Sequence, residues 1–138
     1  MKTLTILSVE DCPIVARILK AIFNRPDVRL IQAATIREGY RLAIEEHPHL
    51  ILMDVRLPDG NGLDLARRLR EDPTTWGIPT IALSGMDSQQ LKAEAAEAGC
   101  FDALPKPVDV YTLAFKVARA LGRTRDVATS ARRRAVCA

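Results

Sequence analysis

Leu50-Ile51-Leu52-Met53-Asp54, followed by VRLPDGNG over residues 55–62, is the stretch that decides the fold. Four apolar residues in a row are typical of a strand covered on both faces, as in the centre of a parallel sheet. The strand ends at a carboxylate, Asp54, and the loop after it is dense in residues that form turns. The stretch therefore predicts a central strand that delivers Asp54 to the carboxyl edge of a sheet.

Short apolar runs alternate with helical periodicity on both sides of this strand. The other expected strands are Thr3–Val9, Val28–Ala33, Ile78–Leu83 and Cys100–Leu104, and the expected helices are Pro13–Asn24, Thr35–His47, Leu63–Glu71, Asp87–Ala98 and Asp109–Leu121. Thr35 and Glu38 have the spacing of a capping box, and Gly99 ends the fourth helix. Five such units predict an α/β fold with an open parallel sheet and helices on both faces.

The composition fits one globular domain. Of 138 residues, 48% are apolar and 27% are charged, and no apolar run is long enough to cross a bilayer. The start, MKTLTILSVEDC, is interpreted as a strand and not a signal peptide, because acidic residues stand where a cleavage site would lie. We therefore expect a cytoplasmic protein that does not enter a membrane.

Cysteine and histidine offer little chemistry. Cys12, Cys100 and Cys137 are odd in number and widely separated, which predicts reduced thiols and neither a disulfide framework nor a zinc site. His47 and His49 flank a proline, and no third metal ligand stands near them in the sequence.

The positive charge belongs to the end of the chain. Residues 122–138 carry five arginines against one aspartate, a balance of +4, whereas the body has a balance of −1. We expect a domain over residues 1–122 and a disordered basic tail over residues 123–138, with no room for an output domain after Leu121. The five are Arg123, Arg125, Arg132, Arg133 and Arg134. They would attract nucleic acid only weakly and in a salt-dependent manner, and no aromatic residue stands among them for base stacking; a solvated tail or a linker stub is the favoured alternative.

Polar side chains stand where four of the expected strands end. These residues are Glu10, Asp11, Asp54, Ser84 and Lys106. Ligands bind at the carboxyl ends of the strands in such sheets, so the five should share one crevice. Clustered carboxylates need a cation, and oxygen ligands favour Mg²⁺. A carboxylate can also form an aspartyl-phosphate, with lysine and metal neutralising the phosphoryl charge and serine donating a hydrogen bond.

Four motifs carry a family resemblance: VEDCP at 9–13, DVRLPDGNGLDL at 54–65, ALSG at 82–85 and AGCFDALPKP at 98–107. In this order and at these intervals the chain resembles the receiver domains of two-component response regulators, notably the stand-alone chemotaxis type, from Thr3 to about Leu121. The resemblance implies a flavodoxin-like (βα)5 three-layer sandwich with a five-stranded parallel sheet in the order 2-1-3-4-5.

The resemblance also implies roles for individual residues. Asp54 would accept a phosphoryl group from a sensor histidine kinase or a histidine phosphotransfer protein. Asp11, Asp54 and the backbone carbonyl of Arg56 would ligate Mg²⁺, and Glu10 would act through a bound water. Lys106, preceding Pro107 through a cis bond, would pair with the phosphoryl group, toward which Ser84 would turn. The protein would be a phospho-acceptor switch and not an enzyme, signalling through protein contacts or onward phosphorelay.

Each of these residues also has a simpler reading when taken alone. An aspartate at a strand end is more often a helix cap, and a lone lysine is usually solvated. Other motifs fail on spacing: an EF-hand loop starting at Asp54 would need acidic or amide side chains at Arg56 and Pro58, and residues 10–13 contain no dinucleotide-binding glycines. A haloacid dehalogenase would need a second aspartate where Arg56 stands.

Four positions bear on how phosphorylation would be read out. Receivers commonly have an aromatic residue where this chain has Ala103, and often phenylalanine where it has Val108. Arg56 places a long cation at the mouth of the site. Ile14 is a candidate docking residue for the kinase, although an isolated exposed apolar side chain would look the same.

Overall fold

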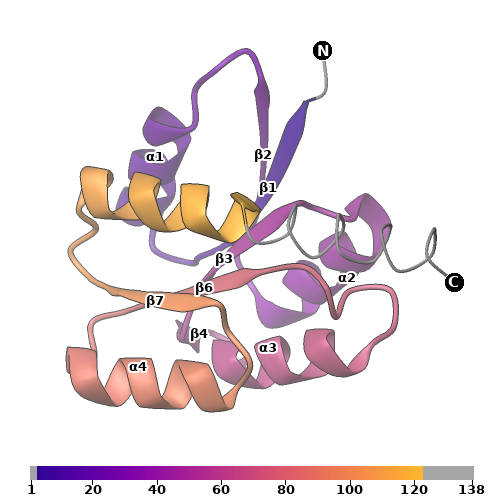
Figure 1. Cartoon of the computed structure of the whole chain (residues 1–138), viewed down its shortest axis with the longest axis vertical. Helices are drawn as coiled ribbons and strands as arrows, with labels where there is room; N and C mark the ends of the chain where they lie inside the picture. The colour runs from indigo at the N-terminus through magenta and orange to yellow at the C-terminus, as the bar shows by residue number, and fades with distance from the viewer. Residues whose placement is uncertain (1–2, 123–138) are drawn as a thin grey trace, which may run out of the picture.

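The computed structural model describes residues 3–122; residues 1–2 and 123–138, which include the expected basic tail, lie outside the described part. Five parallel strands form one sheet in the order β2-β1-β3-β6-β7 (Figure 1). They are β1 (Leu4–Val9), β2 (Val28–Ala33), β3 (Leu50–Asp54), β6 (Thr80–Ser84) and β7 (Asp102–Pro105). Counted along the chain, this is the order 2-1-3-4-5, so the predicted flavodoxin-like sheet is confirmed.

Helices cover both faces of the sheet, as predicted. They are α1 (Pro13–Ile22), α2 (Ile36–Glu46), α3 (Gly62–Glu71), α4 (Ser88–Glu97) and a last helix over residues 110–122. α1 and the last helix lie on one face, and α2, α3 and α4 on the other (Figure 1). None of the helices in the described part has the length and apolar content required to span a bilayer.

Strand β3 contributes side chains to two hydrophobic cores, one on each face of the sheet. All five of its residues are buried, and their side chains alternate between faces. Leu50 and Leu52 pack with α1 and the last helix, whereas Ile51 and Met53 pack with α2, α3 and α4. The continuous apolar run therefore belongs to the central strand, and it ends with Asp54 at the carboxyl edge.

Several boundaries differ from the predicted ones by one or two residues. The fourth strand starts at Thr80, because Ile78 donates its N–H to Thr75 in a turn before it. The fifth strand starts at Asp102, because Gly99, at a φ of +88°, and the residue after it still complete the end of α4. The first helix ends at Ile22 and the second at Glu46, where His47 takes a left-handed conformation.

The loop after Asp54 contains more structure than its composition predicts. It forms a small antiparallel hairpin from β4 (Arg56–Leu57) and β5 (Gly60–Asn61). Gly60 has a φ of +144°, which side chains rarely tolerate. Gly62 follows directly, and a Cβ there would lie 2.1 Å from the backbone oxygen of Asp54. The hairpin can fold back against β3 only because this residue is a glycine.

Candidate functional site

The carboxyl ends of the strands surround an open pocket of about 440 Å³. It is lined by Asp11, Asp54, Arg56, Ser84, Gly85, Met86 and Lys106. Asp54 ends β3, Ser84 ends β6, and Lys106 follows β7. Glu10 and Asp11 connect β1 to α1 and stand beside the same space. Parallel pairing brings these residues together, since it aligns the ends of all the strands at one edge.

Three carboxylates form the acidic part of the pocket. Glu10, Asp11 and Asp54 each place one oxygen so that the three oxygens lie within 4.8 Å of one another. Glu10 and Asp54 are buried, whereas Asp11 is exposed. The sequence-based grouping of these residues therefore agrees with the geometry.

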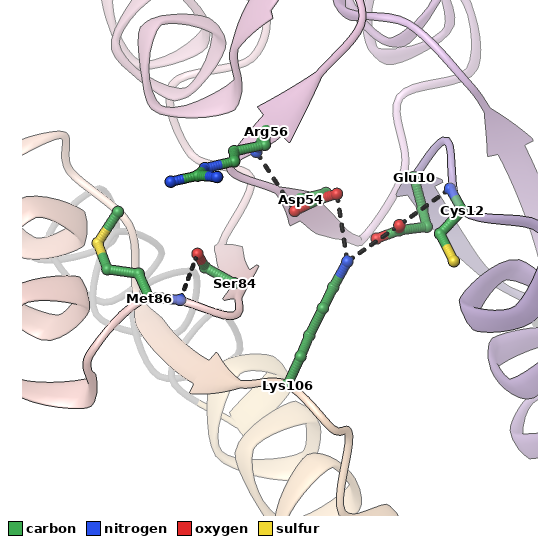
Figure 2. Close-up of polar contacts among 7 residues, drawn as sticks. All are labelled: Glu10, Cys12, Asp54, Arg56, Ser84, Met86 and Lys106. Carbon is green, nitrogen blue, oxygen red and sulfur yellow. Dashed lines mark hydrogen bonds and ion pairs between the residues drawn. The ribbon is translucent and has the colours of Figure 1, made fainter.

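Lys106 lies between the two buried carboxylates (Figure 2). Its Nζ is 3.0 Å from Oε1 of Glu10 and 3.2 Å from Oδ2 of Asp54. The backbone N–H of Cys12 also donates to Oε1 of Glu10, at 3.1 Å, and the N–H of Arg56 donates to Oδ1 of Asp54, at 3.3 Å. One ammonium group thus faces three carboxylates, and the cluster has an excess of negative charge.

The pKa values of Glu10 and Lys106 are both raised in this cluster. Burial raises the pKa of Glu10, and the charge of Asp54 raises it further, although hydrogen bonds from Lys106 and Cys12 oppose the change. Burial lowers the pKa of Lys106, but its hydrogen bond to Glu10 and the charges of Asp54 and Glu10 outweigh burial, so the pKa is raised overall. The lysine is held as a cation and the cluster favours a further positive charge.

The donor set suits a hard divalent cation. Oε2 of Glu10 is buried and has no hydrogen-bond partner among residues 3–122, which is costly for a carboxylate oxygen unless a cation or water meets it. Carboxylate and carbonyl oxygens with few protein ligands are the arrangement that Mg²⁺ takes, since it retains several waters. The carboxylates of Glu10, Asp11 and Asp54 could therefore hold Mg²⁺ in this pocket, directly or through its waters.

Ser84 and Gly85 form the opposite side of the pocket. Oγ of Ser84 accepts the N–H of Met86 at 3.1 Å, and its side chain is buried at the end of β6. A Cβ on Gly85 would meet no described atom within 4 Å, so the surroundings of this pocket residue are open. The Arg56 guanidinium, by contrast, extends away from the Asp54 carboxylate (Figure 2).

The remaining predicted features have ordinary surroundings. The Lys106–Pro107 peptide bond is cis, as expected. Cys12 and Cys100 are free thiols, and burial raises the pKa of Cys100 to about 11. Nδ1 of His49 accepts the N–H of Thr5 at 3.0 Å, which is a structural role. Cys137 lies outside the described residues.

Two of the four positions linked to readout, Ala103 and Ile14, have different surroundings. Ala103 is buried on β7 against the core of α2, α3 and α4. Ile14 is 69% exposed near the start of α1, so its docking role stays a prediction. Sequence reasoning missed Met86, the Cys12 N–H and the direct pairing of Lys106 with Glu10. The contacts of Met86 with Ser84 and of Cys12 with Glu10 are local, each between residues two apart. The pairing of Lys106 with Glu10 joins residues 96 apart, and no local motif signals it.

The fold and the acidic pocket define a flavodoxin-like α/β domain with a site at its carboxyl edge. The family model of the response regulator receiver domain matches residues 6–118. The chain therefore belongs to the receiver-domain family of two-component response regulators. Receiver domains bind Mg²⁺ in an acidic pocket, and the cluster of Glu10, Asp11 and Asp54 occupies that place here.

Curated relatives are similar to this chain over most of its length. Protein PilH from Pseudomonas aeruginosa is 34% identical, over 78% of this chain and 89% of its own. The KDP operon transcriptional regulatory protein KdpE from Escherichia coli is 34% identical over 86% of this chain but 51% of its own. The chain spans about half the length of several such relatives, or less.

Solved structures agree with the fold. A response regulator from Chloroflexus aurantiacus is 29% identical, with a TM-score of 0.83 over 88% of this chain and 99% of its own. The receiver domain of the sensor histidine kinase PA1611 from Pseudomonas aeruginosa is 29% identical, with a TM-score of 0.79 over 87% of this chain and 98% of its own. That receiver has a magnesium ion coordinated in its active-site cleft.

Proposed function

We propose that this chain is a stand-alone phospho-acceptor switch in which Asp54 takes a phosphoryl group from a phosphohistidine. The donor would be a sensor histidine kinase or a histidine phosphotransfer protein. The observation that carries the proposal is the position of Lys106, whose Nζ bridges Glu10 and Asp54 beside an open pocket. A half-buried lysine that pairs with two carboxylates and lines the pocket is placed to meet a third anion.

Asp11, Asp54 and the backbone carbonyl of Arg56 would hold Mg²⁺, and Glu10 would contact it through a water molecule. When bound, the ion supplies neutralisation of the charge on the phosphoryl oxygens. The unpartnered Oε2 of Glu10 supports its part in this arrangement, because an ordered water held by the ion would give that oxygen a donor. The acidic cluster and the magnesium-containing PA1611 receiver support the choice of ion.

The transfer itself uses the carboxylate of Asp54 as the nucleophile. An Asp54 oxygen attacks phosphorus, a P–O bond forms, and the P–N bond to the donor imidazole breaks with its electron pair remaining on nitrogen. Lys106 stays protonated and pairs with a phosphoryl oxygen. This new pair replaces part of the present contact between its Nζ and Asp54. The Ser84 hydroxyl, whose oxygen accepts the Met86 N–H, would donate a hydrogen bond to another phosphoryl oxygen.

The output would be a changed protein-binding surface or onward transfer of the phosphoryl group, in the cytoplasm. In this proposal the chain is a switch that at most catalyses its own phosphorylation and dephosphorylation.

Incubation with acetyl phosphate tests the proposal without the unidentified kinase. Phosphorylation followed by intact-mass spectrometry should require Mg²⁺ and should be lost when a chelator is added, because the donor set alone repels the phosphoryl anion. Equal labelling with and without the metal would reject the metal-dependent mechanism.

A further inference from the structure

Asp59 lies in the turn of the β4–β5 hairpin and binds the start of α2. Its Oδ1 accepts the N–H of Ile36 at 2.8 Å, and its Oδ2 accepts the N–H of Arg37 at 3.1 Å. Thr35 accepts the next helical N–H, that of Glu38, through Oγ1 at 3.1 Å. The first N–H groups of a helix have no partner inside it. The hairpin therefore supplies two of these acceptors for α2, and Thr35 supplies one.

The same hairpin carries the backbone of Arg56. Arg56 pairs with Asn61 across the hairpin, and its N–H donates to Oδ1 of Asp54. At the base, the N–H of Gly62 donates to the carbonyl of Val55 at 2.7 Å. The base is thus fixed to the end of β3, where the acidic pocket lies.

The tip of the hairpin has few other anchors. Strands β4 and β5 have two residues each, and so small a hairpin is not stable by itself. Leu57 is buried, but residues 58–60 are exposed. The two hydrogen bonds of Asp59 therefore fix the end of the hairpin that the base leaves free. The pKa of Asp59 is lowered, first by the N–H of Ile36, as expected for a carboxylate at a helix N-terminus.

We infer that Asp59 is a positioning residue for the Mg²⁺ site, because its clamp on α2 fixes the hairpin and so the direction of the Arg56 carbonyl. This inference rests on the proposed function, in which that carbonyl is a ligand. Asp59 itself touches neither the carboxylate cluster nor the metal position. The competing explanation is that Asp59 only caps α2. In that case, loss of any other cap at the same helix end should weaken Mg²⁺ binding equally.

Thr35 provides the matched control, since it caps the same helix end but does not belong to the hairpin. The variants Asp59→Ala, Asp59→Asn and Thr35→Val are compared in two measurements. Backbone amide NMR signals of the pocket residues are followed during titration with MgCl₂, and the rate of phosphorylation by acetyl phosphate is measured against Mg²⁺ concentration. Both are made well below the unfolding temperature of each variant.

Asp59→Ala should raise the Mg²⁺ midpoint about tenfold in both measurements, the lower end of the range for residues that orient metal ligands. The rate at saturating Mg²⁺ should stay within about twofold of the original, because only metal binding is weakened. The Mg²⁺ midpoint of Asp59→Asn should lie between those of the original protein and Asp59→Ala, since the amide oxygen keeps one acceptor. Thr35→Val should leave the midpoint unchanged.

Equal midpoints for Thr35→Val and Asp59→Ala, or an Asp59→Ala midpoint equal to the original, would overturn the inference. If Asp59→Ala does not fold, the comparison of Asp59→Asn with Thr35→Val decides in the same way. An original protein whose NMR signals and labelling do not respond to Mg²⁺ would instead contradict the proposed function.

Discussion

The ammonium of Lys106 lies 3.0 Å from Oε1 of Glu10, while Oε2 of the same carboxylate is buried without a partner. The lysine therefore satisfies one half of a buried carboxylate and leaves the other half unmet. Such a site lowers the stability of the fold, because uncompensated buried charge is destabilising. This loss of stability can be measured in the metal-free protein.

Glu10→Gln should stabilise the metal-free protein at neutral pH. The folded-state pKa of Glu10 is raised above its ordinary value of 4.5, chiefly by burial, so protonation of Glu10 favours the folded state. The contribution of Glu10 to the free energy of unfolding is thus fully present below pH 4.5. It is lost as the pH rises through the raised pKa of the folded state. Glutamine is neutral like the protonated form of Glu10, so the variant does not lose this stability as the pH rises.

Urea denaturation at several pH values without Mg²⁺ measures this effect. The gain at neutral pH should exceed the roughly 0.5 kcal/mol scatter of surface substitutions. Glu45→Gln, which removes an exposed partner of Arg41 on α2, is the control and should change little. A Glu10→Gln protein less stable than the original at neutral pH would count against this account of the cluster.

Asp11→Asn should weaken Mg²⁺ binding at least about tenfold, or about 1.4 kcal/mol, because it removes a ligand and one negative charge. The phosphorylation rate against Mg²⁺ concentration is the appropriate measurement. Trp76 fluorescence is a poor reporter, since Trp76 lines a separate cavity with Pro79 and Gly99 at the other end of the strands. An unchanged midpoint would reject Asp11 as a ligand.

Gly62→Ala should destabilise the protein by about 3 kcal/mol or more, the upper end for overpacking. The added Cβ would lie 2.1 Å from the backbone oxygen of Asp54, which cannot move without breaking β3. Gly77→Ala is the control, because a Cβ there meets no atom within 4 Å. Urea denaturation of both variants makes the comparison, and similar losses would mean that the hairpin does not press against Asp54.

The sequence predicts those features of the molecule that depend on neighbouring residues. The apolar run of Leu50–Met53 predicts a central strand, and strand-end residues such as Asp54 are then expected to meet at one edge. The hairpin after Asp54 and the clamp of Asp59 on Ile36 were not predictable in this way. The hairpin pairs residues only three to five apart, but a composition rich in turn residues does not say where they will pair. The Asp59 clamp joins residues 23 apart, and the loop sequence does not say which helix end its carboxylate will reach.

Activation should move only the Gly85–Ser88 segment and the start of α4. Ala103 has no side-chain torsion and is packed on β7, so a shift of Ser84 cannot be passed to a swinging aromatic ring at that position. Structures with and without beryllofluoride, a phosphoryl mimic, measure the displacement. A shift of several ångströms along β7 and the last helix would show that readout takes another route.

The most direct measurement is the site of phosphorylation itself. The protein, Asp54→Asn and Asp64→Asn are incubated with acetyl phosphate and Mg²⁺, and the phosphate incorporated per chain is determined. Asp64 is an exposed aspartate of α3 paired with Arg67, so its substitution controls for loss of a carboxylate outside the pocket. The original protein and Asp64→Asn should be labelled alike, with the phosphate mapped to Asp54, and Asp54→Asn should remain unlabelled. An Asp54→Asn protein labelled to the same extent as the original would contradict the account.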